Sequence, residues 1–195
     1  MNTKPLISAL DGVLRPCGFF RHKHTWNRKS PPFVDSIDFQ KSDFTNSITI
    51  NCGVLHTDAY RICWNEDVGA VVYVPNCAIQ VRIGRLMDGL DHWWECKDCV
   101  LPVDEIAGNV QAFVLPFLDT LHSETAMENY LVQKQAGKKG GYHPPIILLA
   151  TLQSWRGDKE SAVKTLTPLV KQTLSVSWKQ ATKEVAERLG LTLDE

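Results

Sequence analysis

Hydrophobic and polar residues alternate over short runs in the first half of the chain. The alternation is clearest over residues 48–54, which read Ile-Thr-Ile-Asn-Cys-Gly-Val. Because successive side chains of a strand point to opposite faces, this pattern predicts antiparallel strands with one buried face and one solvated face. We expect about four such strands, over residues 19–28, 37–41, 48–55 and 78–83. The short polar connection over residues 42–47 predicts that the second and third strands pair as a hairpin.

Hydrophobic residues recur at helical spacing on both sides of the predicted strands. A helix is expected over residues 5–14, and a second over residues 104–121, which Asp104 caps and which covers the sheet. Pro116 lies inside the second helix and removes a backbone donor there, so a kink or a break near Leu115 is expected.

The last third of the chain is predicted to be all helical. Ser123 is placed to cap a segment that ends before a glycine-rich loop at residues 137–141. Further helices are expected over residues 145–155, 159–174 and 177–189, with Asp158 as a cap and Pro168 as a break in the middle one.

These elements predict an α+β fold, in which an antiparallel sheet of about four strands is covered by helices and followed by an all-helical C-terminal extension. We expect the sheet domain over residues 1–122 and the helical extension over residues 123–195. The two are expected to pack together as one compact unit.

Composition and charge exclude several classes of protein. Lys and Arg number 21 against 22 acidic residues, and a net charge of −1 provides no overall attraction to nucleic acid or to an anionic membrane. The longest apolar run, residues 146–150, is far shorter than the roughly 20 residues that span a bilayer. Without an export signal, the six cysteines are interpreted as reduced thiols of a cytoplasmic protein.

Placing the apolar strand residues in the core directs several polar side chains to the opposite face of the sheet. These candidate binding residues are Asp38, Gln40, Thr49, Asn51, Gln80 and Arg82. Amide, carboxylate and guanidinium groups offer directional donors and acceptors, so the face can bind a ligand or a partner chain. The alternative is an ordinary solvated sheet face, which antiparallel sheets commonly have.

A basic segment over residues 15–29 combines cations with aromatic rings, as in proteins that bind single-stranded nucleic acid. The candidate residues for such binding are Arg21, Lys23, Trp26 and Arg28. In the alternative interpretation, the rings belong to the core beneath a charged edge strand. We regard nucleic acid as the less favoured partner.

Two cysteine patterns suggest chemistry without requiring it. Cys96 and Cys99 form a CxxC motif with His92 upstream, but the sequence offers no clear fourth ligand, so we expect no metal and no cofactor. Cys52 and His56 are spaced as a nucleophile and its base, but Cys52 belongs to the apolar face and is interpreted as a core thiol. No catalytic residue is therefore assigned, which favours a protein that is not an enzyme.

Several short motifs resemble the bacterial family known as domain of unknown function 4304. They are residues 14–19 (LRPCGF), Trp26 with Arg28, 39–42 (FQKS), 50–54 (INCGV), 82–84 (RIG), 93–94 (WW) and 115–119 (LPFLD). The resemblance covers roughly residues 6–122. It implies an α+β fold and a bacterial, cytoplasmic setting, and because the family has no established activity it assigns no catalytic residue.

The leading hypothesis is a non-enzymatic module that binds another protein through the polar sheet face or the C-terminal helices. Immunity proteins that neutralise bacterial toxins are one form of such a module. The first alternative is an enzyme or small-ligand binder with a pocket between sheet and helices, in which Gln40, Asn51 and Arg82 supply polar groups. The second is a nucleic-acid binder that uses residues 15–29. No membrane partner is expected, and the oligomeric state is left open.

Overall fold

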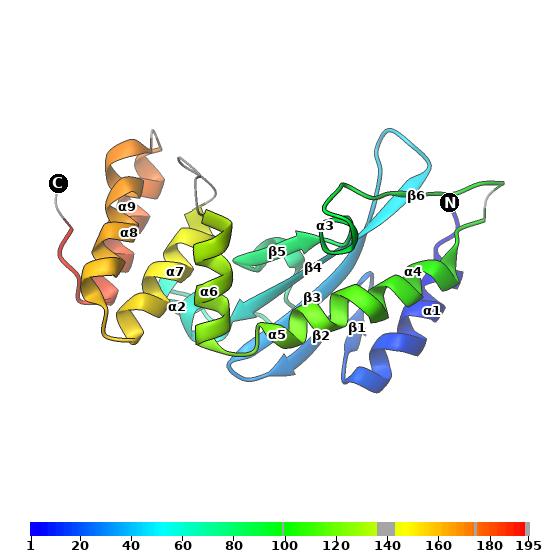
Figure 1. Cartoon of the computed structure of the whole chain (residues 1–195), viewed down its shortest axis with the longest axis horizontal. Helices are drawn as coiled ribbons and strands as arrows, with labels where there is room; N and C mark the ends of the chain where they lie inside the picture. Colours follow the sequence, from blue (N-terminus) through cyan, green and yellow to red (C-terminus); the bar gives the residue numbers. More distant parts are fainter. Residues whose placement is uncertain (99, 136–142, 174, 194–195) are drawn as a thin grey trace. The chain divides into compact units, whose positions relative to one another are not determined.

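The computed structural model describes residues 1–98, 100–135, 143–173 and 175–193 (Figure 1). The chain divides into two compact units. Unit 1 comprises Met1–Leu55 and Gly69–Leu121, and unit 2 comprises His56–Val68 and His122–Glu195. The glycine-rich loop predicted at residues 137–141 lies outside the described residues.

Unit 1 is built on an antiparallel sheet with the strand order β1-β2-β3-β4-β5, in which β6 also pairs with β4. The strands are β1 (Phe20–His22), β2 (Thr25–Ser30), β3 (Phe33–Lys41), β4 (Ser47–His56), β5 (Ile79–Arg82) and β6 (Trp94–Glu95). The α+β fold class and the pairing of the second and third predicted strands, now β3 and β4, are confirmed. The described residues form six strands, where about four were expected.

The single strand predicted over residues 19–28 is in fact a hairpin. Its turn lies at Lys23, whose φ of 55° is in the left-handed region, and β1 and β2 pair antiparallel on either side with Arg21 opposite Trp26. The sequence signal was weak because the turn carries Lys and His instead of the Asn-Gly type of dipeptide that marks tight hairpins.

Helices α1 (Lys4–Leu14), α4 (Val103–Asn109) and α5 (Leu115–Thr120) belong to unit 1, and α1 packs against α4. Figure 1 shows α4 and α5 running along one face of the sheet. Between them, residues 110–114 widen into a π-helical stretch that ends just before Pro116, so the predicted kink takes the form of a change in helical register. Asp104 lies in the first turn of α4, not at its cap, because Pro102 holds that position.

The core of unit 1 lies between this face and the helices. It contains residues from both layers with no exposed surface: Trp26, Ile37, Ile48, Ile50, Cys52, Ile106, Val110, Val114 and Leu118. The predicted inward strand residues are buried, except for Val81, which is only partly buried. The opposite face is covered in part by residues 69–77, whose Val72 carbonyl accepts hydrogen bonds from Asn27 Nδ2 (2.7 Å) and Ser36 Oγ (2.8 Å).

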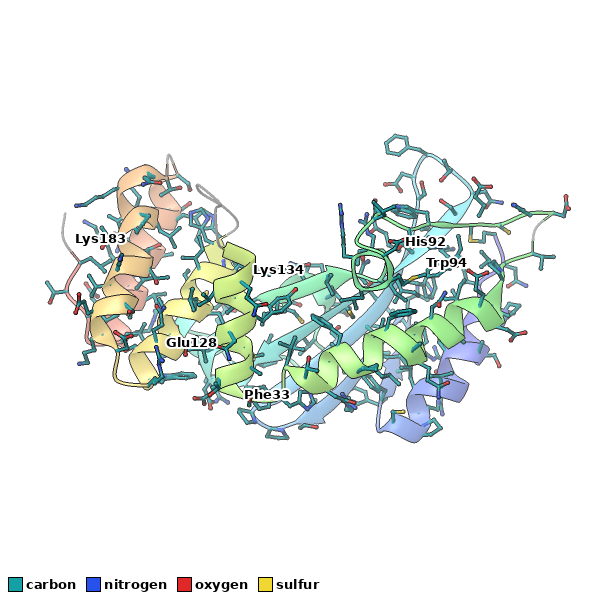
Figure 2. The ribbon with its side chains drawn as sticks, in the orientation of Figure 1. Phe33, His92, Trp94, Glu128, Lys134 and Lys183 are labelled. Atoms are coloured by element: carbon teal, nitrogen blue, oxygen red, sulfur yellow. The ribbon has the colours of Figure 1, made fainter. Side chains whose placement is uncertain are left out.

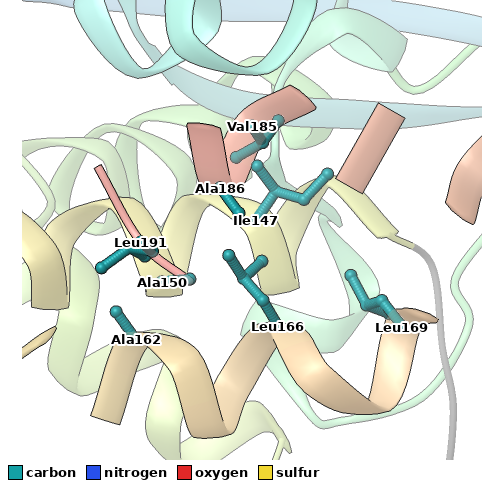
Figure 3. Close-up of a cluster of buried hydrophobic side chains, with 8 residues drawn as sticks. All are labelled: Ile147, Ala150, Ala162, Leu166, Leu169, Val185, Ala186 and Leu191. Atoms are coloured by element: carbon teal, nitrogen blue, oxygen red, sulfur yellow. The ribbon is translucent and has the colours of Figure 1, made fainter. Parts of the chain in front are cut away.

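Unit 2 is helical. Its helices are α2 (Thr57–Trp64), α6 (Glu124–Gln135), α7 (His143–Trp155), α8 (Lys159–Gln172) and α9 (Val176–Arg188). Figure 3 shows the buried cluster that joins α7, α8 and α9, which consists of Ile147, Ala150, Ala162, Leu166, Leu169, Val185, Ala186 and Leu191. Helix α2, which was not predicted from the sequence, packs against α7 and α9.

Helix boundaries in unit 2 follow the predicted caps but not the predicted break. Ser123 Oγ accepts from Ala126 N (3.1 Å), and Asp158 Oδ1 accepts from Ser161 N (3.0 Å). The break predicted at Pro168 is wrong, because α8 continues through it to Gln172. Leu166 and Leu169, which flank the proline, are both in the buried cluster, and their packing keeps the two halves of the helix together.

No helix of the described residues is long and apolar enough to cross a membrane.

Candidate functional site

The polar side chains predicted on one face of the sheet meet on three neighbouring strands of unit 1. Asn51 of β4 lies directly opposite Arg82 of β5 in the antiparallel register. Asn51 Nδ2 donates to Asp38 Oδ1 of β3 at 2.9 Å and reaches Gln40 Oε1 of the same strand at 3.4 Å. The strand period therefore brings a carboxylate, two amides and a guanidinium together, as the sequence predicted.

Arg82 is the centre of this cluster. Its Nη1 donates to both carboxylate oxygens of Asp91, each at 2.7 Å, and its Nη2 and Nε reach Gln40 Oε1 (3.4 Å) and Asn51 Oδ1 (3.5 Å). The guanidinium carbon lies 5.0 Å from the centroid of the Trp93 ring, which is within cation-π distance. The Trp93 indole N–H in turn donates to Asp91 Oδ2 at 3.1 Å. Arg82 is therefore restrained by four residues: Asp91, Gln40, Asn51 and Trp93.

We call this set the polar surface. It consists of Asp38, Gln40, Asn51, Gln80, Arg82, Asp91 and Trp93. Gln40, Gln80 and Asp91 are exposed, while Asp38, Asn51, Arg82 and Trp93 are partly buried. By the strand period of two, it lies on the face opposite to the one along which α4 and α5 run (Figure 1).

The two carboxylates of the polar surface differ in environment. Burial raises the pKa of Asp38, although the hydrogen bond from the Asn51 amide acts in the opposite direction. The pKa of Asp91 is lowered, first by the hydrogen bond from Arg82 and then by that from Trp93. Asp91 is thus the carboxylate that stays ionised most readily, and it is the one that faces solvent.

Thr49, which was predicted to share the solvated face, has no exposed surface. Its Oγ1 is buried and has no hydrogen-bond partner among the described residues. The polar pattern alone could not show this, because alternation assigns a face to a residue but does not show what covers that face.

Asp91 was not among the residues assigned to the site from the sequence, and Trp93 and Trp94 were noted there only together, as a motif of the family resemblance. The two tryptophans have separate roles because consecutive residues of an extended segment point to opposite faces. Trp94 is opposite Ile48 across β4 and β6, is buried, and donates its indole N–H to Glu105 Oε1 at 2.7 Å. The period-two rule, applied to residues 93 and 94, is the signal that would have placed Trp93 on the polar face.

The candidate metal residues do not form a site in the described part of the chain. Cys96 is buried, Cys99 lies outside the described residues, and the His92 ring packs edge-on against Trp94 with 4.6 Å between centroids (Figure 2). Among the described residues, no group of three or more His, Cys, Asp or Glu side chains is arranged to hold a metal ion.

The Cys52 and His56 pair also lacks the arrangement of a nucleophile and its base. Cys52 is completely buried, and burial raises the pKa of its thiol, which favours the unreactive protonated form. His56 instead caps α2, where its Nδ1 accepts from Ala59 N at 3.4 Å.

In the basic segment, Arg21 and Trp26 share one carboxylate. Arg21 Nε lies 3.1 Å from Asp11 Oδ1, and the Trp26 indole N–H donates to the same oxygen at 2.8 Å. Trp26 has no exposed surface, so its ring is part of the core and is not presented for base stacking.

Arg28 of the same segment is an internal structural cation. Its Nε lies 2.7 Å from Asp35 Oδ2, and its Nη2 lies 2.5 Å from Asp119 Oδ1. Lys23 is exposed at the turn between β1 and β2. These pairings neutralise much of the positive charge that the nucleic-acid hypothesis requires.

A family model described as a domain of unknown function, DUF4304, matches residues 10–120, more than half of the chain. The chain belongs to the DUF4304 family. No curated protein and no solved structure matches it. The DUF4304 region contains every residue of the polar surface, whereas α6 to α9 follow after the matched residues. The family match confirms the resemblance seen in the sequence and attaches no activity to these residues.

Proposed function

We propose that this DUF4304 protein is a non-enzymatic interaction module that binds another protein through the polar surface of unit 1. The observation that carries the proposal is Arg82, which is held against Trp93 and two strand amides while its side chain remains 31% exposed. Arg and Trp are among the residue types that contribute most to binding energy at protein interfaces.

The network supports this role because it is organised before any partner binds. Asn51 and Gln40 fix Arg82 from the sheet side, and Asp91 fixes it from the solvent side. Immobilising a long side chain on binding costs conformational entropy, and a side chain that is already restrained loses less of it. The exposed amides of Gln40 and Gln80 supply further donors and acceptors beside the arginine.

Within this proposal the protein acts in a bacterial cytoplasm, and an immunity protein that binds and neutralises a toxin is one form of the function. The resemblance of the sequence motifs to a bacterial family supports the setting. Cys52 is a buried thiol and His56 caps α2, and these structural roles support a binding function over a catalytic one.

The test is affinity capture with the tagged protein from a lysate of its native source, with mass spectrometry as readout. The Gln40→Ala/Arg82→Ala variant removes two side chains of the polar surface. The matched control, Gln180→Ala/Arg61→Ala, removes the same residue types from exposed helical positions of unit 2. Circular dichroism confirms that both variants are folded.

We expect a stoichiometric protein that is captured by the wild type and by the control, and lost with the polar-surface variant. A partner retained equally by all three forms would place binding elsewhere. A small molecule recovered in place of a protein would favour the ligand-binding alternative.

A further inference from the structure

Asp91 reaches Arg82 from a segment that does not belong to the sheet. Residues 88–93 have no helix or strand structure and connect the short helix α3 (Gly84–Met87) to β6. The carboxylate of Asp91 accepts from Arg82 on one side and from the Trp93 indole on the other. The Asp91 carboxylate is therefore bound by one donor from the sheet, Arg82, and by one from its own segment, Trp93.

We propose that Arg82 and Trp93 form a recognition site for a carboxylate, which Asp91 occupies in the free protein and which an Asp or Glu side chain of a partner protein takes over on binding. This inference rests on the proposed function and names the chemistry of the partner at that surface. In the complex, the partner's carboxylate accepts the hydrogen bonds from Arg82 that Asp91 accepts in the free protein.

Exchange of the two carboxylates is favoured by their exposure. The side chains of Arg82 and Asp91 are 31% and 45% exposed, and an ion pair that is open to water contributes little to stability. Arg82 keeps its contacts with Gln40 and Asn51 when Asp91 leaves, because both of these residues belong to strands of the sheet. The site therefore remains formed for an incoming carboxylate.

The local charge also favours an acidic partner. Arg85 lies close enough to Asp91 to lower its pKa, in addition to the larger contribution from Arg82. Once Asp91 has moved away, Arg82 is free to bond the incoming group, whereas Asp38, the other carboxylate of the polar surface, is bonded to Asn51. The exposed amides of Gln40 and Gln80 extend the donor set beyond one ion pair, so a carboxylate on a polypeptide gains contacts that a free carboxylate ion does not.

The Trp93 indole N–H is a direct reporter of the site, because its acceptor is Asp91 itself. Two other indoles in unit 1 also donate to carboxylates: Trp26 to Asp11 and Trp94 to Glu105. Both of those tryptophans are buried, so their signals are internal controls for changes elsewhere in the fold.

The experiment is a titration of the ¹⁵N-labelled full chain, followed through the indole N–H signals. The probes are a capped peptide with two Glu residues, the same peptide with Gln in both positions, and free glutarate. We expect the Glu peptide to shift the Trp93 signal saturably and to leave Trp26 and Trp94 unchanged. The Arg82→Gln variant should lose the response, whereas Arg61→Gln, which removes an arginine paired with Asp58 and Asp67 in unit 2, should keep it.

The Asp91→Asn variant tests the competition. It should bind the Glu peptide about two- to fivefold more tightly, because the peptide no longer has to displace the exposed Asp91–Arg82 ion pair. That factor corresponds to the free energy that one exposed ion pair contributes. Unchanged affinity in this variant, no Trp93 response in any form, or equal responses to the Glu and Gln peptides would each overturn the inference. Glutarate binding as tightly as the peptide would also overturn it, because the site would then recognise a small molecule.

Failure here is distinguishable from failure of the proposed function. If the titration is negative but capture still loses its partner in the Gln40→Ala/Arg82→Ala variant, the surface binds a protein and the carboxylate inference is wrong. If the peptide binds but no partner depends on the surface, the carboxylate site stands and the proposed function is wrong.

Discussion

Arg28 and Asp35 form an ion pair in the interior of unit 1, with Arg28 Nε 2.7 Å from Asp35 Oδ2. The two residues lie directly opposite each other on β2 and β3, and the Asp35 side chain has no exposed surface. Arg28 also reaches Asp119 of α5, so one guanidinium joins the sheet to its covering helix. Arg28, which was a candidate for nucleic-acid binding in the sequence, thus has a structural role.

Removing this cation should destabilise the protein strongly. Arg28→Met leaves the Asp35 carboxylate buried without its main cation, which costs about 3–5 kcal/mol in comparable buried pairs. Urea denaturation measures the free energy of unfolding. The Arg28→Met/Asp35→Leu double variant should recover a large part of the loss, since it removes the uncompensated charge. A single variant as stable as the wild type would show that the pair is not structural.

Asn27 should hold residues 69–77 on the polar face of the sheet. Its side chain bonds both the carbonyl (2.7 Å) and the amide (2.9 Å) of Val72. Asn27→Ala leaves the Val72 amide unsatisfied, while the carbonyl keeps its bond from Ser36 Oγ, and should cost about 1–3 kcal/mol. Ser36→Ala, which removes one donor to the same carbonyl, should cost about 1 kcal/mol. Hydrogen exchange at the Val72 amide should accelerate in Asn27→Ala and change little in Ser36→Ala. Equal protection in both variants would disprove the clamp.

Two glycines should respond in opposite ways to alanine. A Cβ at Gly53 would lie 2.7 Å from Cys77 Cβ and 2.7 Å from the Ile79 carbonyl oxygen. Gly53→Ala should therefore destabilise the protein by about 1–3 kcal/mol through overpacking. A Cβ at Gly12, an exposed position of α1, meets nothing within 4 Å. Gly12→Ala should stabilise by about 0.5–1 kcal/mol because of helix propensity. Thermal denaturation measures the melting temperature of each variant relative to the wild type. Melting temperatures that shift in the same direction for both variants would contradict this prediction.

His56 should make unfolding depend on pH. Burial lowers the pKa of His56, against the smaller opposing effects of Glu124, whose Oε1 lies 3.5 Å from Nε2, and of Asp58. In the unfolded chain His56 has its ordinary pKa of about 6.5, so the unfolded chain binds the proton more readily than the folded protein. The contribution of neutral, buried His56 to the free energy of unfolding is therefore fully present above about pH 6.5. It is lost as the pH falls toward the lower pKa of the folded protein.

The matched variant is His56→Asn, which keeps a capping side chain for α2 and does not titrate. The free energy of unfolding should fall more steeply for the wild type than for the variant between about pH 7 and pH 5. Parallel curves for the two proteins over this range would show that His56 does not titrate differently in the folded and unfolded chains.

Alternation in the sequence was sufficient to predict which polar residues share a face, because the strand period of two fixes that relationship locally. It placed Asp38, Gln40, Asn51 and Arg82 together, and the side-chain hydrogen bonds of Asn51 join them. It did not identify Asp91, because residues 88–92 show no alternation of apolar and polar residues that would mark them as part of the sheet.

Tertiary contacts explain the other differences. Pro168 reads as a helix break by local rules, but burial of its neighbours overrides them. Thr49 has the pattern of a surface residue and is completely buried. Residues 57–64 form α2 and were given no element in the sequence analysis, and their helix is stabilised by packing against α7 and α9, which are distant in sequence.

The central claim is that the polar surface binds a protein partner, and the most direct measurement is the affinity of the captured partner for purified variants. Isothermal titration should show that Gln40→Ala/Arg82→Ala weakens binding by at least about 2 kcal/mol, or roughly 30-fold, as truncation of an interface hot spot does. The control Gln180→Ala/Arg61→Ala should bind like the wild type. Equal affinities for all three proteins would contradict the account.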